Sequence, residues 1–369
     1  MTALRVLHAH SGNLFGGIET MLLTLARRRP DLATHRFALA FEGELARRLR
    51  GEGMPVHVLG QVRLRRPWTV HAVRRILRDV IAHESPDVMI VHSAWDLAAF
   101  GRVALTARIP LVLWAHARAG GAALDKLAAR VRPELVIANS AFTAASYVDR
   151  FAGIPQVVVH PPVEPPRARS AAARRALRES LDVSPDAAVI AQVGRIERGK
   201  GQLELVEALA RLDESLHWVC WEIGGAQRPD DVRLARRIAA RVEELGIASR
   251  VRFLGPRHDV PALLGAADLY AQPTVEPESF GITFVEAMYA GLPVVATAIG
   301  AATEVVAPAA GVLVPPGDPG ALAGVLGELL ADPGRRRQLG AAGPARAHEL
   351  SEPERQVSRA VDALRTFVH

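Results

Sequence analysis

The strongest constraint on the fold is an alternation of short strand-like runs with longer amphipathic segments. The runs hold about four to seven residues rich in Val, Ile and Leu, which is typical of strands buried in a parallel sheet. The segments between them have the length and pattern of crossover helices. The runs in the first half are LRVLHAH, HRFALAF, DVMIVHS, PLVLWAHA, ELVIANS and VVVHPPV.

A proline-rich segment, HPPVEPPRARS at residues 160–170, interrupts this alternation. Its four prolines cannot lie inside a helix or a central strand, so the segment predicts a linker between domains. The alternation then restarts with the strand-like runs AAVIAQVG, HWVCWEIGG, RVRFLG, ADLYAQP, PVVAT and GVLVPP. The helices expected between and after these runs cover residues 201–212, 230–246, 259–267, 280–291 and 318–331.

A chain of 369 residues is also longer than one hydrophobic core usually supports. We therefore expect an α/β protein of two doubly wound, parallel-sheet domains, over residues 1–163 and 171–348, with the linker at 164–170. Residues 349–369 are expected to form a C-terminal helix that packs back on the first domain.

Composition excludes several classes of protein. Cys220 is the only cysteine, which rules out an internal disulfide framework and a cysteine-based zinc site. The N-terminal residues MTALRVLHAHSG lack the parts of a signal peptide, and no run approaches the roughly 20 apolar residues of a membrane span. We expect a soluble, cytoplasmic protein, and the absence of a nucleic-acid motif disfavours DNA binding.

Ligands of open α/β sheets collect beyond the carboxyl ends of the strands, and three loops at such places stand out. The first, SGNLFGGIE, contains Gly16 and Gly17. A glycine pair before a helix lets backbone amides approach a phosphate or sugar, although a turn that needs positive φ explains it about as well. The loop lacks the G-x-G-x-x-G pattern, which disfavours a dehydrogenase.

The second loop follows the first strand of the second domain and contains Gly194, Arg195 and Lys200. Two cations around a glycine-containing turn can clamp a diphosphate. Of the 45 basic residues only Lys126 and Lys200 are lysines, which suggests that a compact ammonium is needed at position 200. The alternative is an ordinary solvated loop.

The third loop, EPESFGITFVEAMYAG, sets Glu278 and Glu286 eight positions apart. In one helix they would be separated by ~12 Å along the axis and ~80° around it. That exceeds the roughly 5–9.5 Å between the carboxylates of a glycosidase. Two carboxylates that contact different parts of one elongated polar ligand fit the spacing better.

The helix of this third segment is expected to begin near Phe280, with Ser279 as its N-cap. Glu278 would then project from the loop and Glu286 from about the second turn, while Gly281 exposes amides at the positive helix end. As alternatives, Thr283 and Glu286 match a capping box, and Glu278 could simply be solvated.

Taken together, these motifs resemble retaining glycosyltransferases of family 4, which have the GT-B architecture. The resemblance rests on Gly16-Gly17, Gly194-Arg195 with Lys200, and Glu278-x7-Glu286 in this order, and it is strongest over residues 190–317. It implies two Rossmann-like domains facing a cleft, with the nucleotide sugar held mainly by the second domain and the acceptor by the first.

The resemblance also implies roles for individual residues. Arg195 and Lys200 would bind the donor diphosphate, Glu286 the ribose, and Glu278 the transferred sugar. The implied catalytic residues are Arg195, Lys200, Glu278 and His116. The implied donor-binding residues are Gly16, Gly17, Gly194, Phe280, Gly281, Ile282, Glu286 and Arg257, the last near the base.

His116, in the run LVLWAHA, is similar to a family histidine near the reacting centre of the sugar, although a lone histidine beside an apolar run is usually a packed core residue. His8, His10 and His92 also stand at strand ends, and we expect them to be packed core residues. Two departures from the family pattern are Ala117 after this histidine and Ser279 after the first glutamate.

The implied reaction is hexosyl transfer to a hydroxyl acceptor with retention, by front-face substitution, without a metal or any cofactor beyond the nucleotide sugar. It would serve synthesis of envelope glycolipid, polysaccharide or a glycosylated metabolite. Hydrolysis or epimerisation of a nucleotide sugar is an alternative, as is a non-catalytic module that binds a nucleotide sugar or glycan.

Residues 62–80 combine arginines, Trp68 and an apolar helical face. This pattern indicates either peripheral contact with an anionic membrane, at its inner face, or an ordinary surface helix solvated by arginine.

Overall fold

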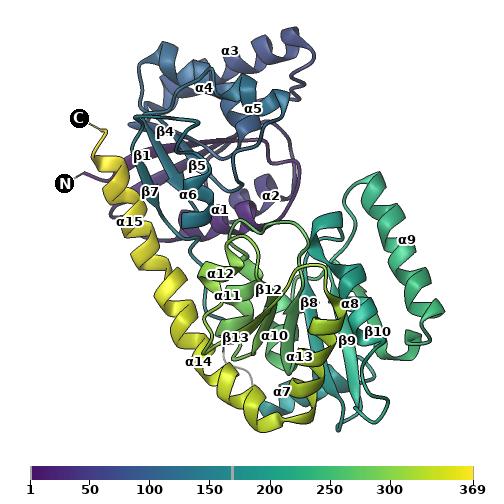
Figure 1. The fold of residues 1–369 in the computed structure, drawn as a ribbon. Coiled ribbons are helices and arrows are strands. Elements are labelled where there is room, and N and C mark those ends of the chain that lie inside the picture. Colours follow the sequence, from purple (N-terminus) through teal and green to yellow (C-terminus); the bar gives the residue numbers. More distant parts are fainter. Residues whose placement is uncertain (1, 168–169, 369) are drawn as a thin grey trace. The chain divides into compact units, whose positions relative to one another are not determined.

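The computed structural model describes residues 2–167 and 170–368, so residues 168 and 169 of the expected linker lie outside it. The chain forms two compact units (Figure 1). The N-terminal unit comprises Met1–Val163 and Ser351–His369, and the C-terminal unit comprises Glu164–Leu350. Among the described helices, none combines the length and the apolar run that crossing a bilayer requires.

The N-terminal unit is built on a parallel sheet of seven strands, ordered β3-β2-β1-β4-β5-β6-β7. The strands are β1 Leu4–His10, β2 Ala33–Leu39, β3 Val56–Val58, β4 Val88–Val91, β5 Leu111–Ala115, β6 Leu135–Ala138 and β7 Gln156–Val158. The helices are α1 Gly17–Arg27, α2 Glu44–Gly51, α3 Pro67–Glu84, α4 Ala94–Ala107, α5 Ala123–Ala128, α6 Ala141–Ala145 and α15 Pro353–Arg365.

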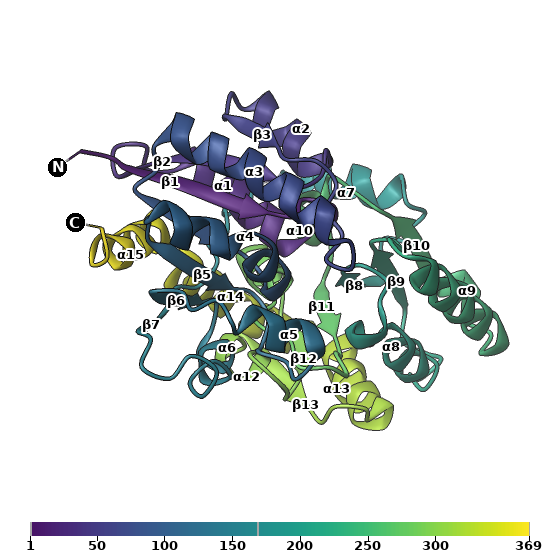
Figure 2. The same cartoon turned by 90° about the horizontal axis from the view of Figure 1, so that it is seen from above.

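Helices cover both faces of this sheet because its strands are apolar on both sides. In Figure 2, α3 lies in front of β1 and β2. The face with Leu7 and Met89 packs against α3 and α4, whereas the face with Val6 and Ile90 packs against α1, α2 and α15. Since side chains alternate along a strand, His8 and His10 point to the same face as Val6.

The C-terminal unit has a parallel sheet of six strands, ordered β10-β9-β8-β11-β12-β13. The strands are β8 Ala188–Val193, β9 Trp218–Ile223, β10 Val251–Gly255, β11 Leu269–Gln272, β12 Val294–Thr297 and β13 Gly311–Val314. The helices are α7 Ala171–Glu179, α8 Gln202–Leu209, α9 Pro229–Glu244, α10 Val260–Ala266, α11 Ile282–Tyr289, α12 Ala302–Val305, α13 Pro319–Ala331 and α14 Pro333–Ser351. Helices α8, α9 and α13 share one apolar core with one face of this sheet.

The predicted fold class of two Rossmann-like parallel-sheet domains is confirmed. Each sheet reverses its strand order once, between β1 and β4 and between β8 and β11. Such a reversal leaves the crevice at the carboxyl ends of the strands where α/β proteins bind ligands. The short strand β3 and the helices α4, α5, α7, α12 and α14 were not among the elements named from the sequence.

The predicted start of the helix in the third segment is wrong. Helix α11 begins at Ile282, and its N-cap is Gly281, with φ of 84° and no side-chain cap, rather than Ser279. A Cβ at Gly281 would lie 2.3 Å from Cδ2 of Phe284, so only glycine fits this turn. With this start, Thr283 and Glu286 are not at the N-cap and N3 positions, which removes the capping-box alternative.

Candidate functional site

The candidate site of the C-terminal unit lies at the reversal between β8 and β11. Strand β8 ends at Val193 and leads into the loop with Gly194, Arg195 and Lys200; β11 ends at Gln272 and leads into the loop that carries Glu278. Because β8 and β11 are neighbouring parallel strands, both loops emerge at the same edge of the sheet. The fold thus brings together two motifs that are about 80 residues apart in the sequence.

Lys200 and Glu278 form an ion pair, with 2.5 Å between Nζ and Oε2. Their side chains are 22% and 17% exposed, so a ligand can reach both groups. The Nε2 amide of Gln272 donates to the same carboxylate oxygen over 3.3 Å. The sequence predicted both residues for the site but not that they contact each other.

The orientation of the Gln272 amide is set by two hydroxyls. The Oε1 atom of Gln272 accepts hydrogen bonds from the Tyr270 hydroxyl and from Oγ1 of Thr283, the latter over 3.0 Å. The Nε2 donor therefore faces Glu278. The carboxylate is held in place by Gln272, which is in turn held by the hydroxyls of Tyr270 and Thr283. Sequence reasoning missed Gln272, although a glutamine that ends an apolar strand at the sheet reversal was a usable signal.

Two buried glutamines hold the loop after β8. Gln192 donates from Nε2 to the carbonyl of Lys200 over 2.8 Å, and Gln202 donates from Nε2 to the carbonyl of Arg195 over 3.1 Å. The glutamines are 1% and 3% exposed. Both backbone positions are therefore fixed by hydrogen bonds from buried side chains.

The loop after β11 touches the loop after β8 and the loop after β12, in both cases through positions that require glycine. Gly201 has φ of 74°, and a Cβ there would lie 1.8 Å from the carbonyl oxygen of Pro273. Gly300 has φ of 64°, and a Cβ there would lie 2.5 Å from the carbonyl oxygen of Glu278, to which it is bridged. These close approaches clamp the backbone on either side of the ion pair.

The two predicted arginines have different surroundings. Arg195 pairs with Glu197 over 3.1 Å and is about one third exposed, next to the Lys200 loop. Arg257 pairs with Asp259 over 2.7 Å beyond β10, which is separated from β8 by β9. The structure thus brings Arg195 to the sheet reversal and leaves Arg257 at the end of the edge strand.

Glu286 projects from the second turn of α11, as predicted. Burial raises the pKa of its carboxyl to about 7, and no described residue donates a hydrogen bond to it. A half-buried carboxylate without a donor is costly unless a ligand supplies one. Burial also raises the pKa of Tyr270, and the charges of Glu286 and Glu278 contribute to that shift.

In the N-terminal unit the glycine pair precedes α1. The Gly16 amide donates to Oε2 of Glu19 over 2.8 Å, and Gly16 itself has φ of −168°. Neither Gly16 nor Gly17 adopts positive φ, so the simple turn alternative does not explain this pair.

Glu19 also belongs to a buried charged cluster. His10 lies 2.9 Å from Oε1 of Glu19 through Nε2 and 2.9 Å from Oδ2 of Asp96 through Nδ1. Burial alone would lower the pKa of His10, but the charges and hydrogen bonds of the two carboxylates outweigh it and raise the pKa to about 10. An imidazolium between two carboxylates thus fixes Glu19, which in turn holds the amide of Gly16.

His116 ends a series of four histidines joined by ring hydrogen bonds. His35 contacts His8 over 2.9 Å, His8 contacts His92 over 3.0 Å, and His92 contacts His116 over 3.1 Å. His8, His10 and His92 are buried, as expected of packed core residues, but they also form polar networks that sequence reasoning missed. The signal that could have revealed these networks is that the histidines stand near the ends of strands, where alternate residues point to the same face of the sheet.

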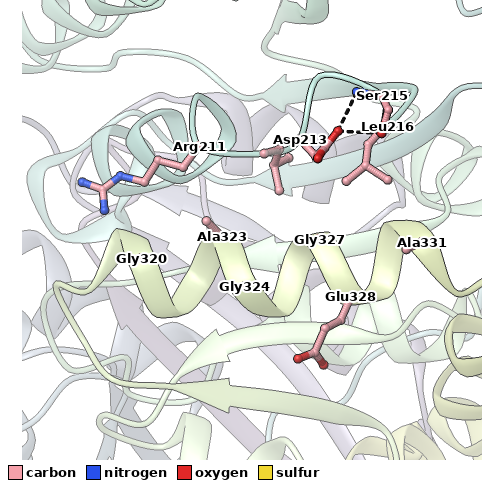
Figure 3. Close-up of a pocket in the computed structure, with 11 residues that line it drawn as sticks. Arg211, Asp213, Ser215, Leu216, Gly320, Ala323, Gly324, Gly327, Glu328 and Ala331 are labelled. Carbon is pink, nitrogen blue, oxygen red and sulfur yellow. Dashed lines mark hydrogen bonds between the residues drawn. The ribbon is translucent and has the colours of Figure 1, made fainter.

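A hollow of about 690 Å³ between α13 and the loop after α8 is separate from this site (Figure 3). Gly320, Gly324 and Gly327 form one wall, and Asp213 accepts two hydrogen bonds from Ser215 on the other side. None of the predicted site residues lines it. Within residues 2–167 and 170–368, no three His, Cys, Asp or Glu side chains are grouped closely enough to hold a metal ion.

Comparison with known proteins supports this assignment from both halves of the chain. The Glycosyltransferase Family 4 model matches residues 15–167, and the Glycosyl transferases group 1 model matches residues 173–346. The chain is also similar to the HepE protein of Anabaena in complex with UDP-glucose, with 25% identity, a TM-score of 0.87, and coverage of 98% of this chain and 100% of that one.

Relatives with similar sequences are glycosyltransferases as well. The D-inositol 3-phosphate glycosyltransferase of Xylanimonas cellulosilytica is 38% identical over 63% of this chain and 55% of the relative. That of Geodermatophilus obscurus is 34% identical over 78% of this chain and 68% of the relative. The matches to the first two such relatives span 55% and 61% of those proteins' own length. The chain belongs to glycosyltransferase family 4 and has its two-domain GT-B fold.

Proposed function

We propose that this protein transfers a hexosyl group from a nucleotide-diphosphate sugar to a hydroxyl acceptor. The observation that carries the proposal is the accessible ion pair of Lys200 and Glu278 at the β8/β11 reversal. The ammonium suits a phosphate oxygen and the carboxylate suits sugar hydroxyls, so the pair combines the two chemical features of a nucleotide sugar.

Donor binding would exchange the partners within this pair. A diphosphate oxygen competes with Glu278 for the Lys200 ammonium, and Arg195 in the same loop supplies a second cation. Oε2 of Glu278, still held by Gln272, then becomes available to accept hydrogen bonds from the sugar. Gly194, Phe280, Gly281 and Ile282 would supply backbone contacts beside these side chains.

Glu286 would bind the ribose. Its carboxylate has no donor among the described residues, and ribose hydroxyls are donors that favour its charged form. The N-terminal unit would receive the acceptor, and it contributes the proposed donor-binding residue Gly17 and the proposed catalytic residue His116. The similarity to HepE with bound UDP-glucose makes a UDP-hexose the first donor to test, and the D-inositol 3-phosphate glycosyltransferases make a polyol phosphate the first acceptor.

For the chemical step we propose front-face substitution with retention and without a metal. The acceptor oxygen forms its bond to the anomeric carbon on the face from which the nucleotide departs. The bond from that carbon to the phosphate oxygen breaks, and the acceptor proton passes to the departing phosphate. Lys200 and Arg195 stabilise the negative charge that grows on the diphosphate.

A thermal-shift panel of UDP-, GDP-, ADP- and TDP-sugars tests the donor assignment. A ligand at 100 times its dissociation constant adds ~2.7 kcal/mol to the free energy of unfolding, which is visible as a rise in Tm. The anomeric configuration of the product, read by NMR from an α-linked donor, tests retention. Equal turnover with and without EDTA is the result expected of a metal-independent reaction.

We also propose that residues 62–80 contact an anionic membrane surface. Trp68 is 68% exposed at the start of α3, and Arg63, Arg65 and Arg66 beside it are exposed too. Arg74 differs, because it donates to the carbonyls of Ala98 and Ala99. Co-sedimentation with vesicles that contain anionic lipid tests this proposal; binding that does not depend on anionic lipid contradicts it.

A further inference from the structure

The histidine series, His35, His8, His92 and His116, runs across four neighbouring strands or their ends in the order β2, β1, β4, β5. Each link joins an Nδ1 to an Nε2, so all three hydrogen bonds can run in one direction. A neutral imidazole has one N–H and one lone pair. Fixing the tautomer of one ring therefore fixes the tautomers of all four.

The direction of the three hydrogen bonds can be inferred from His35, at the buried end of the series. Nε2 of His35 is buried and has no hydrogen-bond partner. If each Nδ1 donates to the next Nε2, this atom is an unpaired acceptor; in the reverse direction it is an unpaired N–H. Buried N–H groups without a partner are rarer in proteins than unpaired acceptors. The first direction is therefore favoured, and it leaves the proton of His116 on Nδ1.

The exposed end of the series is His116. Its Nε2 is occupied by His92, its Nδ1 has no partner among the described residues, and its side chain is partly exposed. A proton wire needs an exit at both ends, but this series stops at the buried Nε2 of His35. The geometry thus fits a device that orients one ring and does not fit a path for protons.

The charges around the series keep it neutral. The His10 imidazolium lies beside His92, with 5.7 Å between ring centroids, and Arg36 follows His35. The carboxylates of Glu19 and Asp96, which approach from α1 and α4, are both directed to His10 rather than to the series. Burial and the charge of His10 lower the pKa of His116 to about 3.

We propose that the histidine series holds His116 as the neutral Nδ1–H tautomer, so that His116 donates a hydrogen bond to an oxygen of the bound substrate and does not accept a proton from it. His35, His8 and His92 are positioning residues in this inference. The role toward substrate rests on the proposed function, whereas the tautomer itself does not depend on it.

The test is long-range ¹H–¹⁵N NMR of the full chain labelled with ¹⁵N-histidine, from pH 5.5 to 8, with His116 assigned by the signals lost in His116→Gln. We expect a protonated Nδ1 and an unprotonated Nε2 for His116 over the whole range. A proton on Nε2, or a ring that titrates in this range, overturns the proposal. The tautomer is read on the native chain, and His116→Gln serves only to assign its signals.

Two variants connect the tautomer to the series. His92→Phe removes the ring that donates a hydrogen bond to Nε2 of His116 and so separates His116 from His8 and His35. We expect the Nδ1–H signature of His116 to be lost or mixed with that of the other tautomer. Trp114→Phe is the matched control, because Trp114 stacks on both His92 and His116, at 6.2 and 6.0 Å, without bonding to either ring. An unchanged signature in His92→Phe, or an equal change in Trp114→Phe, contradicts the proposed role of the series.

The functional readout separates the two proposals. His92→Phe is expected to lower kcat about 2- to 10-fold, the loss of one hydrogen bond to the transition state, with little change in donor KM. A native chain with the expected tautomer but no transfer activity would contradict the proposed function alone. Transfer activity with the wrong tautomer would contradict this inference alone.

Discussion

The ammonium of Lys200 lies 2.5 Å from Oε2 of Glu278, at the point where the strand order of the C-terminal sheet reverses. Each group neutralises the other, and both side chains remain partly exposed. In the proposed function, a diphosphate exchanges for one partner and releases the other for the sugar.

Lys200→Ala is expected to reduce transfer by ~10²–10³ in kcat, because it removes a cation from the departing diphosphate. Its Tm should stay close to that of the native protein. Lys126→Ala is the matched control, since Lys126 is the other lysine of the chain and is exposed on α5. Full turnover by purified Lys200→Ala would refute the site assignment. Unimpaired Lys200→Arg would show that the rarity of lysine carries no information.

Glu278→Gln should separate binding from transfer. The change removes the carboxylate charge at nearly constant volume and frees the Lys200 ammonium, so UDP should bind as tightly as before or more tightly. Transfer should fall by ~10²-fold or more, since the sugar loses its charged hydrogen-bond partner. Glu276→Gln, an exposed change in the same loop, is the control. Calorimetry with UDP that shows much weaker binding to Glu278→Gln would argue against the exchange.

Gly201→Ala should destabilise the protein, because φ of 74° and a contact of 1.8 Å with Pro273 exclude a side chain. Left-handed strain alone costs about 1–3 kcal/mol. The control is Gly324→Ala in the middle of α13, where nothing lies within 4 Å of the new Cβ. That change should stabilise by about 0.5–1 kcal/mol through helix propensity. Urea unfolding measures both, and equal stability of the two variants would contradict the clamp between the loops.

The stability of the protein should fall steeply in mild acid. Burial lowers the pKa of His35 to about 4 and that of His116 to about 3, and it lowers the pKa values of His8 and His92 well below 6.5. Below pH 6.5 the unfolded chain binds protons that these folded histidines do not. Each of these histidines therefore lowers the protein's free energy of unfolding by about 1 kcal/mol as the pH falls from 6.5 to 5.5.

His10 acts in the opposite sense. Its pKa of about 10 lies above the unfolded value, so its contribution is complete below pH 6.5 and is lost as pH rises toward 10. Urea unfolding at pH 5.5, 7 and 9.5 should therefore show lower stability on both sides of neutrality. Constant stability between pH 7 and 5.5 would be incompatible with a neutral histidine series.

Much of the fold follows from the sequence because parallel strands are buried on both faces and read as apolar runs. The four-residue strand β11 was predicted on this basis. The start of α11 was not, because Gly281 takes the cap position through its backbone conformation, whereas Ser279 only matched by residue type. Boundaries that depend on one φ angle cannot be deduced from residue preferences.

The site was predictable in its residues but not in its contacts. Lys200 stood out because lysine is rare in this chain, and Glu278 because it belongs to the motif with Glu286. Their pairing, however, depends on β8 and β11 being neighbours in the sheet. His8 and His92 were assigned to the core because a histidine beside an apolar run, even at a strand end, is usually a packed core residue. Their link to His116 arises from strand register, which places all three on one face of the sheet.

The most direct test of the central claim is release of nucleoside diphosphate and formation of glycosylated product from a UDP-hexose, with D-inositol 3-phosphate and other polyol acceptors, by the native protein and by Lys200→Ala. We expect product that depends on the acceptor, with turnover ~10²–10³ lower in the variant. Donor consumption without acceptor would indicate a hydrolase or epimerase. Donor binding without turnover across the UDP-, GDP-, ADP- and TDP-sugars would contradict the proposed transferase activity.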